Sequence, residues 1–309
     1  MNLMNSLLQN LSTEMEKHAY KMRLVPVQHL ADLQQDIVGR HAQGLFDEQF
    51  FATRLTFYDF QLPETLPTAR SIIVVAAHSP QTRVMFSQND KTVALTIPPT
   101  YVGYNLLPQK IEAILTEQLA PHGYRTTRVR LPLKSLAVHS GLSEYGRNNI
   151  TYTPGMGSFF QLVAYFSDLP CPEDRWREPV MLQRCQTCKA CINHCPTNAI
   201  PTERFLLHAE RCLVYFNEKP PEYPFPEWVS PIAHNSLIGC MTCQRVCPEN
   251  EAFLDQFASE VVFSREETSI LLNGTDIDQI PPETVQKLEQ IDMLSDLQLI
   301  PRNLGVFFK

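Results

Sequence analysis

Residues 185–196 read Cys185-Gln-Thr-Cys188-Lys-Ala-Cys191-Ile-Asn-His-Cys195-Pro196, a complete C-x2-C-x2-C-x3-C-P run. This spacing lets three thiolates reach one iron–sulfur cubane while the fourth reaches a neighbouring cubane. The run therefore predicts a ferredoxin-like fold for the middle of the chain, with short turns organised around metal.

Four more cysteines follow at suitable spacing and complete a set of eight ligands, which is sufficient for two four-iron clusters. The crossed pattern of two-cluster ferredoxins assigns Cys185, Cys188, Cys191 and Cys247 to one cluster and Cys195, Cys212, Cys240 and Cys243 to the other. Structural zinc is the alternative, because zinc also takes four thiolates from C-x2-C pairs. Three cysteines at successive x2 spacing before a Cys-Pro pair favour iron–sulfur.

Two adjacent cubanes are suited to passing electrons one at a time, although clusters that only stabilise a fold also exist. The pairing of crossed ligands favours electron transfer. The ninth cysteine, Cys171, lies outside the pattern, and we interpret it as an ordinary thiol.

The charge of the chain argues against a general nucleic-acid binder. The 309 residues carry a formal net charge of −7, whereas such proteins usually present a basic footprint to the phosphate backbone. The first twenty residues do not have the basic and apolar regions of an export signal, and no apolar run approaches the ~18 residues that span a bilayer. We expect a cytoplasmic protein with reduced cysteines and no membrane association.

The pattern of apolar residues predicts strands alternating with helices before the cysteines, which indicates an α/β layered domain. Strands are predicted at 71–77, 93–97 and 159–166, and helices over the N-terminal stretch to about 41, at 106–119 and at 133–140. We expect three parts: an α/β domain over 1–180, a two-cluster ferredoxin-like domain over 181–250 and a helical C-terminal cap over 251–309.

Glycines gather in one region of a glycine-poor chain. Gly141, Gly146, Gly155 and Gly157 are four of only eleven glycines and lie within seventeen residues. Glycine allows backbone to approach another group closely, so this region is a candidate cofactor pocket. The alternative is that these glycines are simply turn residues between a helix and a strand.

The same region resembles a known family. Leu136-Ala-Val-His-Ser-Gly-Leu-Ser-Glu-Tyr-Gly-Arg-Asn148, Gly157-Ser-Phe-Phe160 and Asp168-Leu169, followed by the double-cluster cysteines, resemble the epoxyqueuosine reductases, which share an iron–sulfur module with reductive dehalogenases. The resemblance covers about residues 20–309 and implies an N-terminal domain that holds cobalamin. By matched positions, the corrinoid would be surrounded by Gly141, Tyr145, Gly146, Arg147, Asn148, Gly157 and Ser158.

The chain departs from this family at the expected proton donor. Family members carry an acidic residue just before the matched region, whereas residues 124–132 contain no carboxylate. Tyr101, Tyr104 and His139 are the candidate replacements, since a positioned phenol or imidazole can serve as a general acid. A tRNA substrate is not expected, because the chain is acidic and stops at Lys309 without the helical extension of typical members.

These features together predict an enzyme, an iron–sulfur oxidoreductase. Electrons from an external flavodoxin or ferredoxin would pass through two clusters to cobalamin, which reduces a substrate other than tRNA. One alternative is a corrinoid-binding or cobalamin-reducing electron-transfer protein without turnover of its own. A further alternative is epoxyqueuosine reduction in tRNA with a substituted donor.

Overall fold

A computed structural model describes residues 3–309 and divides the chain into two compact units. The first unit consists of Met1–His78 and Asn105–Cys188, and the second of Ser79–Tyr104 and Lys189–Lys309. The described helices and strands of the first unit are α1 (Leu3–Lys17), β1 (Tyr20–Pro26), α2 (Leu30–Ala42), α3 (Glu48–Arg54), β2 (Ser71–His78), α4 (Leu106–Leu119), β5 (Thr126–Arg128), α5 (Leu133–His139), β6 (Glu144–Tyr145), β7 (Thr151–Tyr152) and β8 (Phe160–Ser167).

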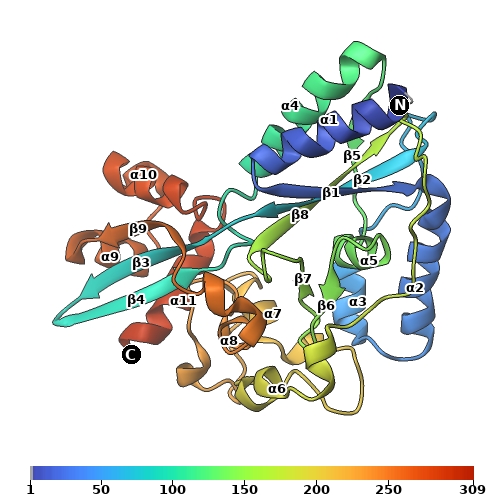
Figure 1. Cartoon of the computed structure of the whole chain (residues 1–309). Coiled ribbons are helices and arrows are strands. Elements are labelled where there is room, and N and C mark those ends of the chain that lie inside the picture. Colours follow the sequence, from blue (N-terminus) through green and yellow to red (C-terminus); the bar gives the residue numbers. More distant parts are fainter. Residues whose placement is uncertain (1–2) are drawn as a thin grey trace. The chain divides into compact units, whose positions relative to one another are not determined.

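The first unit is built on an antiparallel sheet with the strand order β1-β2-β8-β5. Successive side chains of a strand point to opposite faces, so the unbroken apolar run of β2 supplies two cores. Ile73 and Val75 pack with α1 and α4, while Ile72 and Val74 pack with α2 and α5. Figure 1 shows α1 and α4 lying together on one face of this sheet. The predicted α/β layered fold is therefore confirmed.

The second unit joins early and late parts of the chain in one sheet with the order β4-β3-β9. Strand β3 pairs with β4 in antiparallel and with β9 in parallel register, and α9, α10 and α11 cover the sheet through Leu271, Leu288 and Leu304. Its described helices and strands are β3 (Gln81–Gln88), β4 (Lys91–Ile97), α6 (Ala190–His194), α7 (Leu213–Asn217), α8 (Thr242–Arg245), β9 (Phe257–Phe263), α9 (Arg265–Leu272), α10 (Pro282–Gln290) and α11 (Ile300–Gly305).

Most of the predicted elements are present, and the N-terminal prediction needs a correction. The strands at 71–77, 93–97 and 159–166 and the helices at 106–119 and 133–140 are confirmed by β2, β4, β8, α4 and α5. The N-terminal helix ends at Lys17, because Ala19 adopts a left-handed conformation with φ 58°. The chain then forms β1 along the edge of β2 before it returns to helix at α2.

The last helical segment anchors the proline-rich stretch between Cys212 and Cys240. The Arg302 guanidinium donates hydrogen bonds to four backbone carbonyls, and Asn303 donates to two. The accepting residues are Phe216, Asn217, Pro220, Tyr223 and Leu237. Planar guanidinium geometry suits such multiple contacts, so α11 holds the irregular backbone in place.

His234 lies buried under this anchor. Its ring meets Phe225 edge-on, with the ring centroids 4.5 Å apart. Burial, with a contribution from the nearby charge of Arg302, lowers the pKa of His234 to about 4. The imidazole is therefore neutral in the folded protein at physiological pH.

None of the described helices is long and apolar enough to cross a membrane.

Leu115 in α4 offers a direct test of the first core, because its side chain is fully buried whereas Leu106 in the same helix is 54% exposed. We expect Leu115→Ala to lower the free energy of unfolding by about 2–5 kcal/mol through lost burial and the cavity left behind. Leu106→Ala is the matched control and should change it by less than about 0.5 kcal/mol. Anaerobic urea titration followed by circular dichroism measures both; equal effects would contradict the layered packing.

His234 predicts a pH dependence of stability. An unfolded histidine binds its proton near pH 6.5, whereas folded His234 does so near 4, so the unfolded state binds more protons between these values. Stability from this residue is present above pH 6.5 and is lost as the pH falls toward 4. Between pH 7 and pH 5 the wild type should lose about 2 kcal/mol that His234→Phe retains. Parallel pH profiles of unfolding for the two proteins would contradict the assignment.

Candidate iron–sulfur and cofactor site

The first two predicted cysteine ligands lie at the C-terminal end of the first unit. Cys185 lies in the 3-10 helix η3 (Gln183–Gln186), and Cys188 lies in the turn that follows. Strand β6 directs this segment, because Tyr145 exchanges backbone hydrogen bonds with Val180 and Leu182. The backbone leading to the ligands thus pairs with the hairpin of β6 and β7.

The side chain of Arg147 hydrogen-bonds the backbone of the turn that carries Cys185. Its Nε and Nη2 atoms donate hydrogen bonds of 3.2 and 2.9 Å to the carbonyl oxygen of Cys185. A guanidinium offers several donors in a fixed plane, so both bonds form from one side chain. Arg147, a predicted corrinoid residue, therefore contacts the backbone of a predicted cluster ligand.

The other six ligands belong to the second unit and sit at the ends of short helices. Cys191 lies in α6 and Cys243 in α8, and these two helices pack against each other. Cys195, Cys212 and Cys247 have extended backbone, with ψ of 115°, 131° and 121°. A residue before proline is driven from helical to extended backbone, which explains why helix α6 stops at Cys195 and why Cys247 is extended before Pro248.

The surroundings of the predicted ligand thiols are compatible with iron–sulfur ligation. All eight are half-buried. Amide donors reach two of the sulfurs: Ala199 N lies 3.3 Å from Cys195 Sγ, and Asn235 Nδ2 lies 3.3 Å from Cys240 Sγ. Such donors are typical partners of cluster thiolates.

The predicted corrinoid residues mainly build the hairpin. A Cβ at Gly146 would lie 2.5 Å from the Tyr152 ring, so this position requires glycine. Asn148 is buried, accepts from Ile150 N and donates to the Tyr152 hydroxyl at 3.1 Å. Gly146 therefore has the turn role that the sequence analysis gave as the alternative to a cofactor role.

The remaining members are also packed within the first unit. Gly157 accepts a hydrogen bond from Thr153 N through its carbonyl, and Ser158 is buried. Burial raises the pKa of Tyr145 to about 12, and Ser135 hydrogen-bonds this side chain. Contact of these residues with a corrinoid stays a prediction.

A cavity of about 530 Å³ opens beside part of the glycine region. Of the seven predicted corrinoid residues, Gly141 lines it. Lys21 crosses one side and donates to the carbonyl of Pro154 at 2.5 Å. The volume is in the range of a pocket for one small ligand. Its lining is formed by residues 12, 16, 19–23, 78, 141, 142 and 154–156.

The three candidate proton donors lie in different surroundings. Tyr101 is in the second unit, and its hydroxyl donates to Glu218 Oε1 at 2.6 Å. Burial, followed by the charges of Glu218, Cys212 and Cys240, holds the pKa of Tyr101 well above its usual value. Tyr104 is 59% exposed. The structure therefore places Tyr101 beside two predicted ligands of one cluster and leaves Tyr104 open to solvent.

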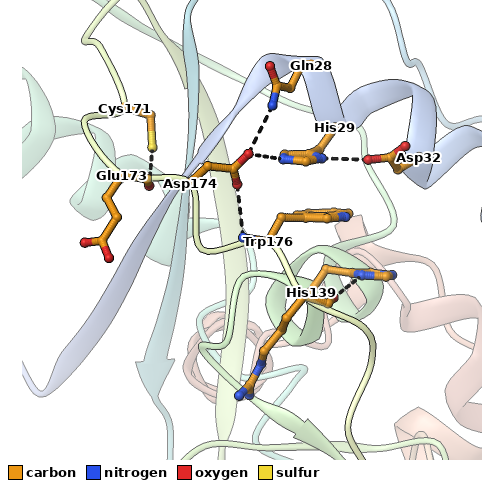
Figure 2. A network of polar contacts seen from close by, with 9 residues as sticks. Gln28, His29, Asp32, His139, Cys171, Glu173, Asp174 and Trp176 are labelled. Carbon is orange, nitrogen blue, oxygen red and sulfur yellow. Dashed lines mark hydrogen bonds and ion pairs between the residues drawn. The ribbon is translucent and has the colours of Figure 1, made fainter.

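His139 belongs to a stacked network that the sequence did not indicate. Figure 2 shows Trp176 between two parallel imidazoles, with its ring 4.3 Å from His139 and 4.3 Å from His29. His139 Nδ1 lies 2.7 Å from the carbonyl oxygen of Arg177, while the two nitrogens of His29 meet Asp32 and Asp174 at 2.6 and 2.8 Å. The network fastens the strap of residues 171–177 that leads to Cys185.

Two carboxylates and a thiol complete this part of the first unit. Burial would raise the pKa of Asp174, but hydrogen bonds from His29 and the Trp176 amide lower it below the usual range. Cys171 donates to the carbonyl of Glu173, and burial raises the pKa of its thiol. Asp168 accepts from Arg125 N at 2.7 Å, so this motif residue binds the segment 124–132 in which no carboxylate occurs.

Comparison with known proteins identifies the cysteine segment. Residues 184–250 match a family model described as a 4Fe-4S double cluster binding domain. The prediction of two four-iron clusters is therefore confirmed, while the pairing of individual cysteines stays a prediction.

Curated relatives carry the name epoxyqueuosine reductase. The protein of Aliivibrio fischeri is 37% identical over 155 residues, which are 49% of this chain and 39% of that protein. The protein of Cellulophaga algicola is 29% identical over 191 residues, 59% of this chain and 58% of that protein. This chain thus aligns with less than two thirds of the length of these relatives.

Solved structures extend the likeness to the whole fold. Epoxyqueuosine reductase from Bacillus subtilis superposes with a TM-score of 0.69 and 20% identity, covering 98% of this chain and 81% of that chain. The reductase from Streptococcus thermophilus gives 0.67 and 17% over 99% and 80%. The resemblance predicted from residues 136–148 is confirmed as a similarity: the chain is similar in sequence and fold to epoxyqueuosine reductases, and residues 184–250 match a double four-iron cluster domain.

Proposed function

We propose that this protein is an oxidoreductase that passes electrons from an external flavodoxin or ferredoxin through two four-iron clusters to a bound cobalamin. The observation that carries the proposal is the double-cluster segment at residues 184–250, with its eight half-buried cysteines. Two neighbouring clusters of this type are arranged for one-electron transfer. The substrate would be an electrophilic compound other than tRNA.

The crossed pairing of ligands is part of the proposal. Cys185, Cys188, Cys191 and Cys247 would hold one cluster, and Cys195, Cys212, Cys240 and Cys243 the other. The second group is supported by the electrostatic influence of both Cys212 and Cys240 on one hydroxyl, that of Tyr101. The packing of α6 against α8 supports the exchange of ligands between the two motifs.

Cobalamin binding rests on the family resemblance and on the hairpin of the first unit. When bound, a corrinoid would supply a strongly reducing metal centre. Gly141, Tyr145, Gly146, Arg147, Asn148, Gly157 and Ser158 would surround it. The bonds from Arg147 to the carbonyl of Cys185 support this location, because they tie the proposed cofactor loop to a cluster ligand.

Among the three candidate proton donors, we rank Tyr104 first. Its side chain is 59% exposed, whereas the Tyr101 hydroxyl is committed to Glu218 and the His139 ring to the Arg177 carbonyl and the face of Trp176. A donor must reach the reacting group, which favours an accessible phenol.

The second candidate function is electron delivery to cobalamin without turnover of a substrate. The absence of a carboxylate from residues 124–132 favours it, because related reductases have a proton donor there by resemblance. Epoxyqueuosine reduction in tRNA is the third candidate, supported by the names of the curated relatives.

The iron content of the protein tests whether the segment 184–250 binds two four-iron clusters. Anaerobically purified protein should contain about eight irons, and Cys240→Ser should lose about half of them. Cys171→Ser is the matched control, since Cys171 is half-buried like the ligands but lies outside their pattern. A wild-type content of about two irons, or zinc in their place, would overturn the proposal.

Two assays separate the candidate functions. Titration with cobalamin, followed by its absorption spectrum, should show saturable binding. Absence of binding would refute the proposed corrinoid and leave the proposed clusters unaffected. In a queuosine-deficient strain, we expect tRNA to retain epoxyqueuosine after expression of this protein. Restored queuosine would instead establish the tRNA substrate.

A further inference from the structure

Asn235 lies at the turn that leads into the motif Cys240-Met-Thr-Cys243, just after the 3-10 helix η5 (Pro231–Ala233). Its side chain is half-buried. The Nδ2 atom lies 3.3 Å from Cys240 Sγ and 2.9 Å from Thr242 Oγ1, and it also donates to the carbonyl of Ala233 at 3.1 Å. The amide group therefore bridges a predicted ligand sulfur and the residue between the two ligands.

The orientation of this amide follows from its other partners. Its Oδ1 atom accepts a hydrogen bond of 2.9 Å from Met241 N and one of 3.1 Å from the Ser236 hydroxyl. A backbone N–H only donates, so the atom facing it must be the oxygen. The NH2 group must then face the sulfur of Cys240.

We propose that Asn235 raises the reduction potential of the cluster to which Cys240 belongs, an inference that rests on the proposed function. Reduction adds negative charge to a cluster and its thiolates. A hydrogen bond donated to a ligand sulfur stabilises that charge, and such outer contacts tune cluster potentials. Asn235 is thus a positioning and tuning residue rather than a ligand.

Other groups contact or influence the predicted ligand sulfurs in different ways. Arg245 interacts electrostatically with Cys240 and hydrogen-bonds the Thr96 hydroxyl, so it contributes positive charge from the helix α8. The Cys195 sulfur receives its hydrogen bond from the backbone N–H of Ala199, which every substitution except proline retains. Asn235 is therefore the side chain through which the effect of an N–H···S bond can be tested.

The test is a redox titration of the anaerobically purified full chain, followed by electron paramagnetic resonance. Asn235→Asp keeps an oxygen for Met241 N but removes the donor to sulfur. We expect one of the two midpoint potentials to fall, with a change of about tenfold in the reduction equilibrium, or 59 mV for one electron, while the other potential stays. Ser236→Ala is the matched control, because Ser236 contacts the oxygen of Asn235 and not the sulfur, and it should leave both potentials unchanged.

Asn235→Ala provides a second variant without an added acid, and it should lower the same potential. Unchanged or raised potentials in a variant with full iron content would overturn the inference. Failure of both variants to retain iron would also overturn it, since Asn235 would then brace the turn and not tune the cluster. A wild-type protein without about eight irons would instead refute the proposed function.

Discussion

The turns that present the eight thiols impose the main constraint on this structure. A backbone that must turn repeatedly around metal ligands cannot satisfy its polar groups in helices or strands, yet buried carbonyl and amide groups need partners. Side chains supply them here. Arg147 binds the carbonyl of Cys185, Asn217 donates to Gly239 O at 2.6 Å, and Asn250 donates to Gln244 O at 2.9 Å.

The same constraint explains why, within each unit, residues of the packed core bind the backbone near the cysteines. In the second unit, Arg302 and Asn303 use α11, itself packed on the core of the sheet β4-β3-β9, to hold the backbone between Cys212 and Cys240. In the first unit, the stacked rings of His29, Trp176 and His139 fasten the strap that runs toward Cys185. Each unit thus fixes its own ligand turns from an ordered core.

The sequence predicted what depends on local pattern. The cysteine spacing identified the double-cluster segment, and the apolar run at 71–77 identified β2, because both signals lie within a few neighbouring residues. Strands β3 and β9 were not predicted. They pair in parallel although about 170 residues separate them, and β3 begins with the polar residues Gln81, Thr82 and Arg83. Their stability comes from tertiary pairing, which no local window contains.

The candidate site shows a different limit, since a motif marks residues without giving their task. Gly146 and Asn148 were predicted from the resemblance to lie at a corrinoid, and their contacts in the structure shape the hairpin around Tyr152. Tyr101 was predicted as a proton donor, but its hydroxyl binds Glu218. Spacing cannot reveal such partners, because Glu218 lies 117 residues away from Tyr101. A residue that shapes a turn and a residue that touches a cofactor can therefore give the same sequence signal, and the hydrogen-bond partners in the structure show the first of these roles.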